Sequence, residues 1–298
     1  MNEWVSIMEV GPRDGLQNEP VLVDTPTRVE LIQRLVATGL THIEVGAFVS
    51  PKWVPQMANS ATVLCALDTQ SPTHFYPVLV PNQQGLEAAI AANARDIAIF
   101  GAASEAFSQK NINCSIAESL KRFALVVKQA QAANIRVRGY VSCAVGCPYQ
   151  GHVAPEDVAS VARALYDMGC YEISLGDTIG VGTPKTVLAM WDAVCHDLPN
   201  TALAGHFHNT YGMAIANIYA SLERGIRTFD ASVAGLGGCP YARRASGNVA
   251  TEELVYLLQG LGFQTGIDLP RLIETAHFIA TKLGRPPASH VAQALHAP

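Results

Sequence analysis

The sequence has no long apolar run and few charged residues. No stretch reaches the roughly 18 consecutive apolar residues that a membrane-spanning helix needs, so we expect no membrane partner. Only 15% of the 298 residues are charged, and the formal net charge is −5. Lysine and arginine are scattered along the chain, which does not produce the basic footprint of a nucleic-acid-binding protein. The composition therefore argues against a nucleic-acid partner and favours a small molecule.

The seven cysteines show no pairing pattern. Their number is odd, and the CxxxC of Cys143 and Cys147 has neither the second half of a zinc knuckle nor the two-residue gap of a redox dithiol. The chain also begins without a charged-then-apolar leader. Together these features favour reduced thiols and predict a cytoplasmic protein.

What the sequence does contain is an alternation of short β-branched runs with longer stretches at helical spacing. Hydrophobic residues make up 49% of the chain, enough for a sizeable core. Helix patterns cover 27–39, 155–169 and the stretch around 87–94, and Gly39 and Gly169 are placed to end the first two. The predicted strands are 6–10, 42–48, 75–80, 96–102, 136–143, 171–177, 202–208 and 228–235.

This alternation predicts an α/β fold with a parallel sheet, closed into a (β/α)8 TIM barrel. A doubly wound sheet is the structural alternative, but its GxGxxG loop is absent and GPRDGLQNE follows the first strand instead. We expect one domain over 1–298, with the barrel at about 4–250 and a C-terminal helical extension at about 251–298.

Polar residues collect where the predicted strands end. In a barrel, the carboxyl ends of the strands and the loops that follow them form the active face, so these side chains should meet at one mouth. They are Arg13, Asp14, Gln17, Glu44, Asp177, Thr178, His206, His208, Cys239 and Asn248.

His206 and His208 stand two residues apart at the end of the seventh predicted strand. On a strand, this spacing points both imidazoles to the same side. They could be two histidines with local hydrogen bonds, or they could join the Asp14 carboxylate and an amide oxygen around a divalent cation. Such oxygen and nitrogen ligands with open positions suit six-coordinate Mg²⁺ or Mn²⁺ better than zinc. The spacing alone leaves both interpretations open.

Cys239 and Arg13 each allow two interpretations as well. Cys239 lies in the glycine-rich segment GLGGCPYARRASGN, which could form a mobile loop that carries the thiol over a ligand. The alternative is an inert buried thiol. Arg13 could be an ion-pair partner of Asp14 or could stabilise an oxyanion at the barrel mouth.

Seven ordered motifs resemble the hydroxymethylglutaryl-CoA lyase family, and the likeness runs from about residue 5 to about 295. The motifs are EVGPRDGLQNE (9–19), FVSPKWVPQM (48–57), IFGAASEAFSQKNINCS (99–115), VRGYVSCAVGCPY (137–149), YEISLGDTIGVGTP (171–184), HFHNTYG (206–212) and VAGLGGCPYARRASGNVATEEL (233–254). The resemblance implies a metal-dependent TIM barrel that cleaves 3-hydroxy-3-methylglutaryl-CoA to acetyl-CoA and acetoacetate, a step of leucine degradation.

The resemblance also implies a role for each matching residue. The divalent-metal ligands, Mg²⁺ or Mn²⁺ being expected, would be Asp14, His206, His208 and Asn248. Arg13 would hold the thioester carbonyl and Cys239 would be the catalytic thiol, with Asp14 and His206 also candidates for moving protons. Contacts to the acyl-CoA substrate would come from Arg13, Gln17, Glu44, Lys110, Asn111, Asn113, Asp177 and Thr178. We further expect a homodimer, because barrels of this kind often pair.

Four positions depart from the family pattern: Ala47, Asn209, Arg243 and Arg244. They could retune the acyl pocket for another branched 3-hydroxyacyl-CoA, such as a methylmalyl-type or longer-chain thioester, or they could be neutral drift. Two further alternatives are a condensing enzyme of the isopropylmalate synthase type and a non-catalytic CoA-binding barrel.

Overall fold

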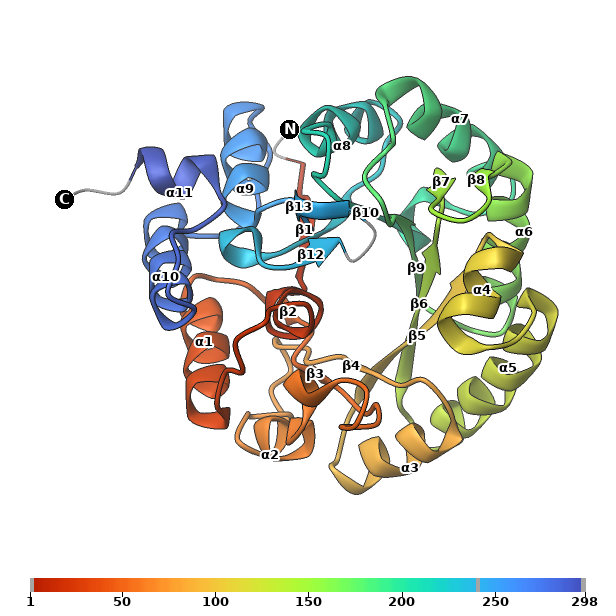
Figure 1. Cartoon of the computed structure of the whole chain (residues 1–298), viewed down its shortest axis with the longest axis horizontal. Helices are drawn as coiled ribbons and strands as arrows, with labels where there is room; N and C mark the ends of the chain where they lie inside the picture. The colour runs from red at the N-terminus through yellow and green to blue at the C-terminus, as the bar shows by residue number, and fades with distance from the viewer. Residues whose placement is uncertain (1–2, 240–241, 296–298) are drawn as a thin grey trace.

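The structure is a computed structural model that describes residues 3–239 and 242–295, with the backbone alone described for 239 and 242–246. Its centre is a curved parallel sheet surrounded by helices (Figure 1). The strands of this sheet are β1 (Ser6–Glu9), β2 (His42–Ile43), β3 (Gly46–Ala47), β4 (Val78–Leu79), β5 (Asp96–Ala102), β6 (Arg136–Ser142), β9 (Glu172–Asp177), β10 (Leu203–Phe207) and β11 (Thr228–Ala231).

The second predicted strand closes the barrel, although it is divided into β2 and β3. These two pieces stand at opposite ends of the hydrogen-bonded strand order. Between them, the Glu44 N–H donates to the carbonyl of Glu9 on β1 at 2.9 Å, and the Val45 N–H donates to the carbonyl of Pro77, just before β4, at 3.0 Å. Because this segment bonds to both neighbours, the predicted closed (β/α)8 barrel is confirmed.

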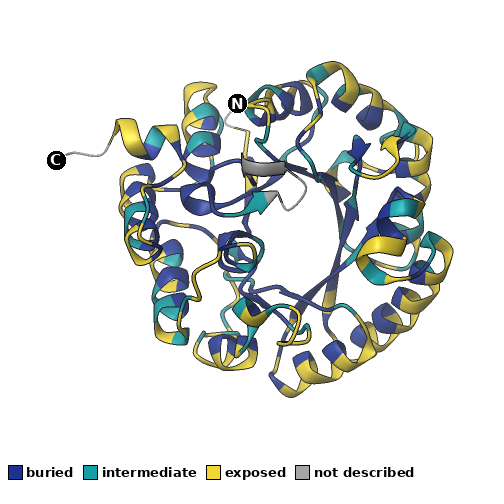
Figure 2. Cartoon of the chain, in the orientation of Figure 1, coloured by how far each residue is buried: buried dark blue, intermediate teal, exposed yellow. Residues whose placement is uncertain are grey.

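Helices form a ring around the barrel and bury its outer face (Figure 2). They are α1 (Thr25–Ala37), α2 (Ser60–Cys65), α3 (Gln83–Ala91), α4 (Glu105–Ile112), α5 (Ile116–Ala132), α6 (Pro155–Asp167), α7 (Pro184–Val194), α8 (Ala214–Glu223), α9 (Thr251–Gly260), α10 (Leu269–Lys282) and α11 (His290–Ala294). The additional C-terminal helices were predicted, and α10 packs against both α9 and α1 (Figure 1). In the described ranges, no helix is long and apolar enough to cross a membrane.

Helix α1 shows how the sequence sets the boundaries of these helices. Asp24 caps its N-terminus by accepting a hydrogen bond from the backbone N–H of Thr27 at 2.8 Å. Leu31 and Ile32 lie fully buried on its inner face. Gly39 follows the helix with a φ of +99°, a conformation that favours glycine, so the predicted stop is confirmed.

Several features differ from the predicted elements. The strand expected over 75–80 is reduced to β4 (Val78–Leu79). The strand expected over 228–235 ends at Ala231, because the chain turns into the short helix η4 (Val233–Gly235), where Ala234 has a φ of 59°. Two small hairpins were not predicted. They pair β7 (Gly146–Cys147) with β8 (Gly151–His152) and β12 (Gly238–Cys239) with β13 (Ala242–Ser246).

Candidate active site

A single wide helical turn after β1 carries two of the predicted site residues, Arg13 and Asp14. This turn, η1 (Gly11–Gly15), closes with a hydrogen bond from the Gly15 N–H to the Val10 carbonyl at 3.1 Å, a five-residue spacing that is often found at functional sites. A Cβ at Gly11 would lie 2.6 Å from a carboxylate oxygen of Glu9. The glycine is therefore needed for the close packing that places the turn.

Arg13 lies between two carboxylates at the barrel mouth. Its Nη1 donates to Asp14 Oδ1 at 2.9 Å, and its Nε donates to Glu44 Oε2 at 2.8 Å. Tyr140 donates its hydroxyl to the same Glu44 oxygen at 3.2 Å. Glu44 thus holds the guanidinium in place on one side, and the side of Arg13 that faces Asp14 lies at the barrel mouth.

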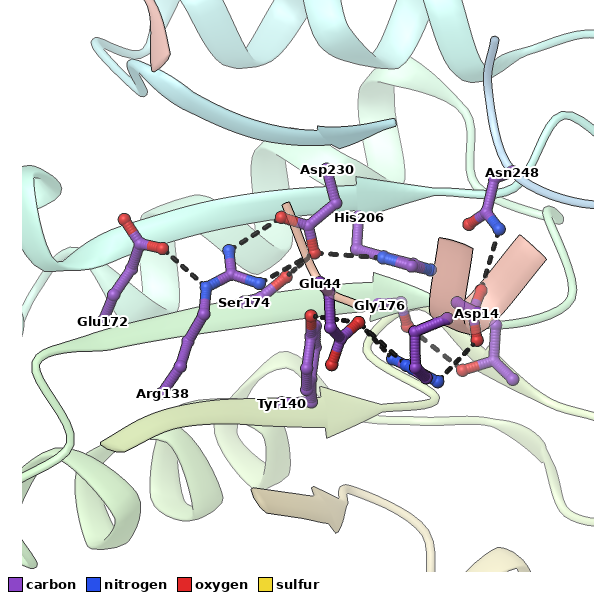
Figure 3. Close-up of polar contacts among 12 residues, drawn as sticks. Asp14, Glu44, Arg138, Tyr140, Glu172, Ser174, Gly176, His206, Asp230 and Asn248 are labelled. Carbon is purple, nitrogen blue, oxygen red and sulfur yellow. Dashed lines mark hydrogen bonds and ion pairs between the residues drawn. The ribbon is translucent and has the colours of Figure 1, made fainter. Parts of the chain in front are cut away.

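His206 projects from β10 into the barrel and is oriented by a buried carboxylate. Its Nδ1 lies 3.1 Å from Asp230 Oδ2 (Figure 3). The carboxylate also pairs with Arg138, whose Nη2 donates to Asp230 Oδ1 at 2.7 Å. With Nδ1 held by the carboxylate, Nε2 of His206 is the nitrogen left for a ligand, which is the arrangement typical of metal-binding histidines.

Asp14, His206 and His208 form a group with metal-ligand spacing. One ligand atom from each lies within 4.8 Å of the other two. Nδ1 of His208 is buried and has no hydrogen-bond partner among the described residues. Asn248 adjoins the group, since its Nδ2 donates to Asp14 Oδ2 at 2.8 Å (Figure 3). A buried imidazole nitrogen without a partner fits a group that could hold a cation.

The protonation states of Asp14 and His208 suit a cation, whereas a cation would have to compete with a proton for His206. Burial opposes the charge on Asp14, but the nearby Arg13 guanidinium lowers the pKa of that carboxyl to about 2. Burial lowers the pKa of His208 to about 4, so its imidazole is neutral at pH 7 with a free lone pair. Burial also opposes protonation of His206, but the hydrogen bond and charge of Asp230 raise the pKa of this imidazole above its usual value.

The ionic network inside the barrel was not predicted from the sequence. Arg138 on β6 is fully buried and bridges Asp230 and Glu172, and the hydroxyl of Ser174 donates to Asp230 Oδ2 at 2.8 Å (Figure 3). The available signal was the alternation of Arg138 and Tyr140 at inward positions of a predicted barrel strand. A charged side chain at an inward position needs a buried partner on a neighbouring strand.

The structure separates Asp177 from the group at the mouth. Its neighbour Gly176 faces His206, and side chains alternate along a strand, so the Asp177 carboxylate lies on the outer side of β9. There it accepts hydrogen bonds from the N–H groups of Val181 and Gly182 at 3.1 and 2.8 Å. These bonds give Asp177 a role in positioning the loop after β9, and its contact with substrate stays a prediction.

The other residues predicted to contact the substrate lie in different settings. The hydroxyl of Thr178 accepts a hydrogen bond from the Cys143 N–H at 2.8 Å, which ties together the loops after β9 and β6. Oε1 of Gln17 is buried without a hydrogen-bond partner among the described residues, as a ligand contact would require. Lys110, Asn111 and Asn113 are exposed on α4 and at its end.

Cys239 lies in β12, in the segment after β11. Its side chain and those of Arg243 and Arg244 lie outside the described part of the structure. The glycine-rich segment approaches the metal-ligand group through its backbone, because the Asn248 amide also donates to the carbonyl of Leu236 at 3.4 Å.

Comparison with known families decides which chemistry this arrangement serves. The HMGL-like family model matches residues 4–279. This chain belongs to the HMGL-like family. A hydroxymethylglutaryl-CoA lyase of Pseudomonas mevalonii is 58% identical over 293 residues, covering 98% of this chain and 97% of the relative. The predicted resemblance is therefore confirmed, and the relatives at this level of identity are named hydroxymethylglutaryl-CoA lyases.

Solved structures of this family agree in fold over nearly the whole chain. The hydroxymethylglutaryl-CoA lyase of Pseudomonas aeruginosa is 54% identical, with a TM-score of 0.97 and coverage of 99% of this chain and 98% of that one. A lyase from Acinetobacter baumannii, solved in complex with coenzyme A and 3-methylmalate, is 35% identical with a TM-score of 0.92 and covers 99% of this chain and 98% of its own.

Asn209, one of the departures from the family pattern, has a structural role here. Its Oδ1 accepts a hydrogen bond from the Ala214 N–H at the start of α8, at 3.3 Å. Because an aspartate oxygen can accept the same bond, we expect N209D to change kcat/KM for the family substrate by less than about threefold. Steady-state kinetics measure this, and a change of acyl preference in the variant would show that Asn209 contacts the substrate instead.

Two buried carboxyl groups on the outer side of the barrel bond to the backbone of the turns η1 and η4. Glu9 accepts hydrogen bonds from the N–H groups of Gly11 and Val233, at 2.8 and 2.9 Å, and so joins η1 to η4. Glu252 accepts from the Ala234 N–H at 2.8 Å, and its other oxygen is unpaired among the described residues. Burial raises the pKa of Glu9 to about 7 and that of Glu252 to about 8.

Glu252 should therefore make the stability of the fold depend on pH. The unfolded chain releases this proton near pH 4.5, whereas the folded chain holds it to about pH 8. The folded state binds more protons between these values, so the contribution of Glu252 to stability falls as the pH rises through them. Glutamine stays neutral, and we expect E252Q to exceed the parent in stability by about 1–3 kcal/mol at pH 8.5 and to match it near pH 5. Thermal unfolding at the two pH values tests this, and a less stable variant at pH 8.5 would contradict it.

Proposed function

We propose that this chain is a divalent-metal-dependent carbon–carbon lyase that cleaves 3-hydroxy-3-methylglutaryl-CoA to acetyl-CoA and acetoacetate. The observation that carries the proposal is the meeting of Asp14, His206 and His208 at the barrel mouth, directly beside the Arg13 guanidinium. The names of the relatives supply the substrate class, and the named complex with coenzyme A supports a thioester.

Asp14, His206 and His208 would hold the metal, with the amide of Asn248 as a fourth ligand. The carboxylate oxygen, the two imidazole nitrogens and an amide oxygen suit Mg²⁺ or Mn²⁺ with positions left for substrate oxygens. When bound, the metal supplies Lewis acidity that lowers the pKa of the substrate's C3 hydroxyl. Asp230 would not bind the metal itself. It would keep Nε2 of His206 directed at the metal position.

Arg13 would stabilise the negative charge that the reaction creates. When the C2–C3 bond breaks, its electron pair moves onto the thioester part of the substrate as an enolate. A guanidinium held by Glu44 and Asp14 is fixed before the charge develops, so it stabilises that charge without reorganising. We assign contacts with the CoA portion to Lys110, Asn111 and Asn113, which are exposed on α4 and at its end.

Two protons must move in the cycle. The C3 hydroxyl loses one, and we assign its acceptance to the Asp14 carboxylate, because both nitrogens of His206 would be engaged, Nδ1 with Asp230 and Nε2 with the metal. The C2 carbanion gains one, and we assign that donation to Cys239, whose segment adjoins Asn248 through Leu236. Replacing Cys239 with alanine should then lower kcat while leaving metal affinity unchanged.

A second substrate deserves testing because the Acinetobacter relative was solved with 3-methylmalate. We therefore propose assaying a panel of 3-hydroxyacyl-CoA thioesters that includes 3-hydroxy-3-methylglutaryl-CoA and methylmalyl-type thioesters, with release of acetyl-CoA or propionyl-CoA as the readout. The proposal expects the highest kcat/KM for 3-hydroxy-3-methylglutaryl-CoA. A preference for another thioester would keep the lyase class and overturn the substrate, and no cleavage in the presence of metal would overturn both.

The proposal also includes a cytoplasmic homodimer acting in leucine degradation. The cysteines whose side chains are described are all free, which suits a reducing compartment. Sedimentation of the purified chain tests the dimer independently of any substrate.

A further inference from the structure

A cavity lies at the amino ends of β4, β5 and β6, at the opposite end of the barrel from the mouth. Active sites of such barrels lie at the carboxyl ends of the strands, whereas the amino ends serve stability. The cavity has a volume of about 170 Å³. A protein cavity of about 150 Å³ can hold a molecule the size of benzene, so this one has room for a small organic ligand. We call it the amino-end cavity, and its lining includes Leu64, Phe75, Tyr76, Arg95 and Arg136.

One polar group in this lining is buried and lacks a partner. Tyr76 is only 8% exposed, and its hydroxyl has no hydrogen-bond partner among the described residues. Burial raises the pKa of this hydroxyl, so it stays protonated at pH 7 and can donate a hydrogen bond. Because buried polar groups normally have partners, the unpaired hydroxyl points to a ligand that enters the cavity.

Arg136 is held in a fixed position at the wall of the cavity. Its Nε donates to Asp96 Oδ1 at 2.6 Å. Its guanidinium also lies over the rings of Phe75 and Tyr171, at 4.4 and 4.9 Å from their centroids. No described residue accepts a hydrogen bond from Nη1 of Arg136. This nitrogen can therefore donate to a ligand without any rearrangement of the side chain.

Arg95 adds a second guanidinium to the cavity. Its Nη1 donates to the Thr69 carbonyl at 3.3 Å, and its other nitrogens have no partner in the part of the chain that the structure describes. Apart from His74, the charged residues of the lining are the two arginines and Asp96, which is already paired with Arg136. One positive charge is left over, which favours a ligand with a single negative charge.

The apolar part of the lining favours an organic anion. Leu64 is fully buried, and Phe75 presents its ring. A phosphate ion would leave this apolar wall uncovered, whereas a short acid can place its alkyl tail there and its carboxylate on a guanidinium. Guanidinium groups also bind carboxylates through two parallel hydrogen bonds.

We propose that the amino-end cavity binds the monoanion of a short-chain carboxylic acid, with the carboxylate on the guanidinium groups of Arg95 and Arg136. The Tyr76 hydroxyl donates to the same carboxylate, and the alkyl tail lies against Leu64 and Phe75. This site is separate from the barrel mouth and does not depend on the proposed lyase activity. Because only the folded chain has the cavity, its ligand stabilises the fold.

Calorimetric titration of the full chain with 3-methylbutanoate tests the site. We expect one saturable site per chain and an unfolding temperature that rises with the ligand concentration. The amide of the same acid has nearly the same shape without the charge, so it should bind at least tenfold more weakly. Inorganic phosphate should also bind more weakly than the acid. Binding of the amide or of phosphate as tight as that of the acid would overturn the proposed ligand class.

Variants locate the bound acid. Y76F loses only a hydroxyl without a described partner, so it should fold normally by circular dichroism and bind 3-methylbutanoate about tenfold more weakly. R95Q should weaken binding at least tenfold. The matched control is R122Q, since Arg122 is an exposed arginine on α5 outside the cavity, and R13Q is the control for binding at the mouth. Both controls should bind the acid as the parent does.

Three results would overturn the proposal. The first is a parent protein without saturable binding of the acid. The second is binding as tight as the parent's in both Y76F and R95Q, and the third is binding that R13Q loses, which would place the acid at the barrel mouth.

Discussion

Replacing Arg13 with glutamine lowers kcat for thioester cleavage by about a thousandfold. The Arg13 guanidinium is fixed by two carboxylates, with Nε 2.8 Å from Glu44 Oε2 and Nη1 2.9 Å from Asp14 Oδ1. The charge it presents is therefore in place before the enolate forms. Glutamine keeps a donor but loses the charge, so it should affect the transition state far more than substrate binding. Steady-state kinetics should show the loss in kcat, with KM changed only slightly.

The control for Arg13 is lysine. R13K restores the charge, but a single ammonium cannot reproduce the bonds to both Glu44 and Asp14, so we expect activity between that of the parent and that of R13Q. Metal affinity, measured by calorimetry, should stay within a few-fold of the parent value in both variants. An R13Q enzyme with a kcat near that of the parent would show that Arg13 only neutralises the negative charge of its neighbouring carboxylates.

Replacing Asp230 with asparagine should damage both the fold and the site. The change leaves Arg138 buried inside the barrel without the carboxylate that accepts from its Nη1 and Nη2 at 3.1 and 2.7 Å. Breaking such a buried pair costs roughly 3–5 kcal/mol of unfolding free energy. His206 also loses the charge that orients it, so the affinity for Mn²⁺ should fall about 10–100-fold. Chemical denaturation and calorimetry measure the two effects.

Glu172 provides the matched control for Asp230. It is the other carboxylate of the pair network, with its Oε1 2.6 Å from Arg138 Nε, but it does not contact His206. E172Q should therefore destabilise the fold less than D230N does and should leave Mn²⁺ affinity unchanged. Equal losses of Mn²⁺ affinity in the two variants would mean that the loss comes from general destabilisation of the barrel. Asp230 would then have no role in positioning His206.

Most of the fold could be predicted from local sequence patterns, because the positions of strands and helix ends depend mainly on neighbouring residues. The β-branched run at 96–102 coincides with β5, and Gly39 ends α1 as expected, because a strand run and a helix stop are properties of neighbouring residues. The predicted strand over 228–235 was too long, because Ala234 adopts a left-handed conformation that its residue type does not announce.

The metal-ligand group could be predicted from spacing and family motifs, but its surroundings could not. His206 lies on β10 and His208 directly follows that strand in extended backbone, so their common direction follows from the sequence. The pairing of Arg138 with Asp230 spans 92 residues, and it depends on which strands become neighbours in the closed sheet. The bonds of Asp177 to the Val181 and Gly182 N–H groups could not be predicted either, since they depend on how the loop after β9 folds back on the strand end.

The central claim is that Asp14, His206 and His208 hold a divalent cation on which carbon–carbon cleavage depends. The most direct test treats the purified protein with a chelator, exchanges it into metal-free buffer, and follows acetyl-CoA and acetoacetate release from 3-hydroxy-3-methylglutaryl-CoA as Mg²⁺ or Mn²⁺ is returned. We expect no cleavage without metal, full recovery for the parent, and no recovery for H208A at the same metal concentration. Cleavage by the metal-free parent, or equal recovery in H208A, would contradict it.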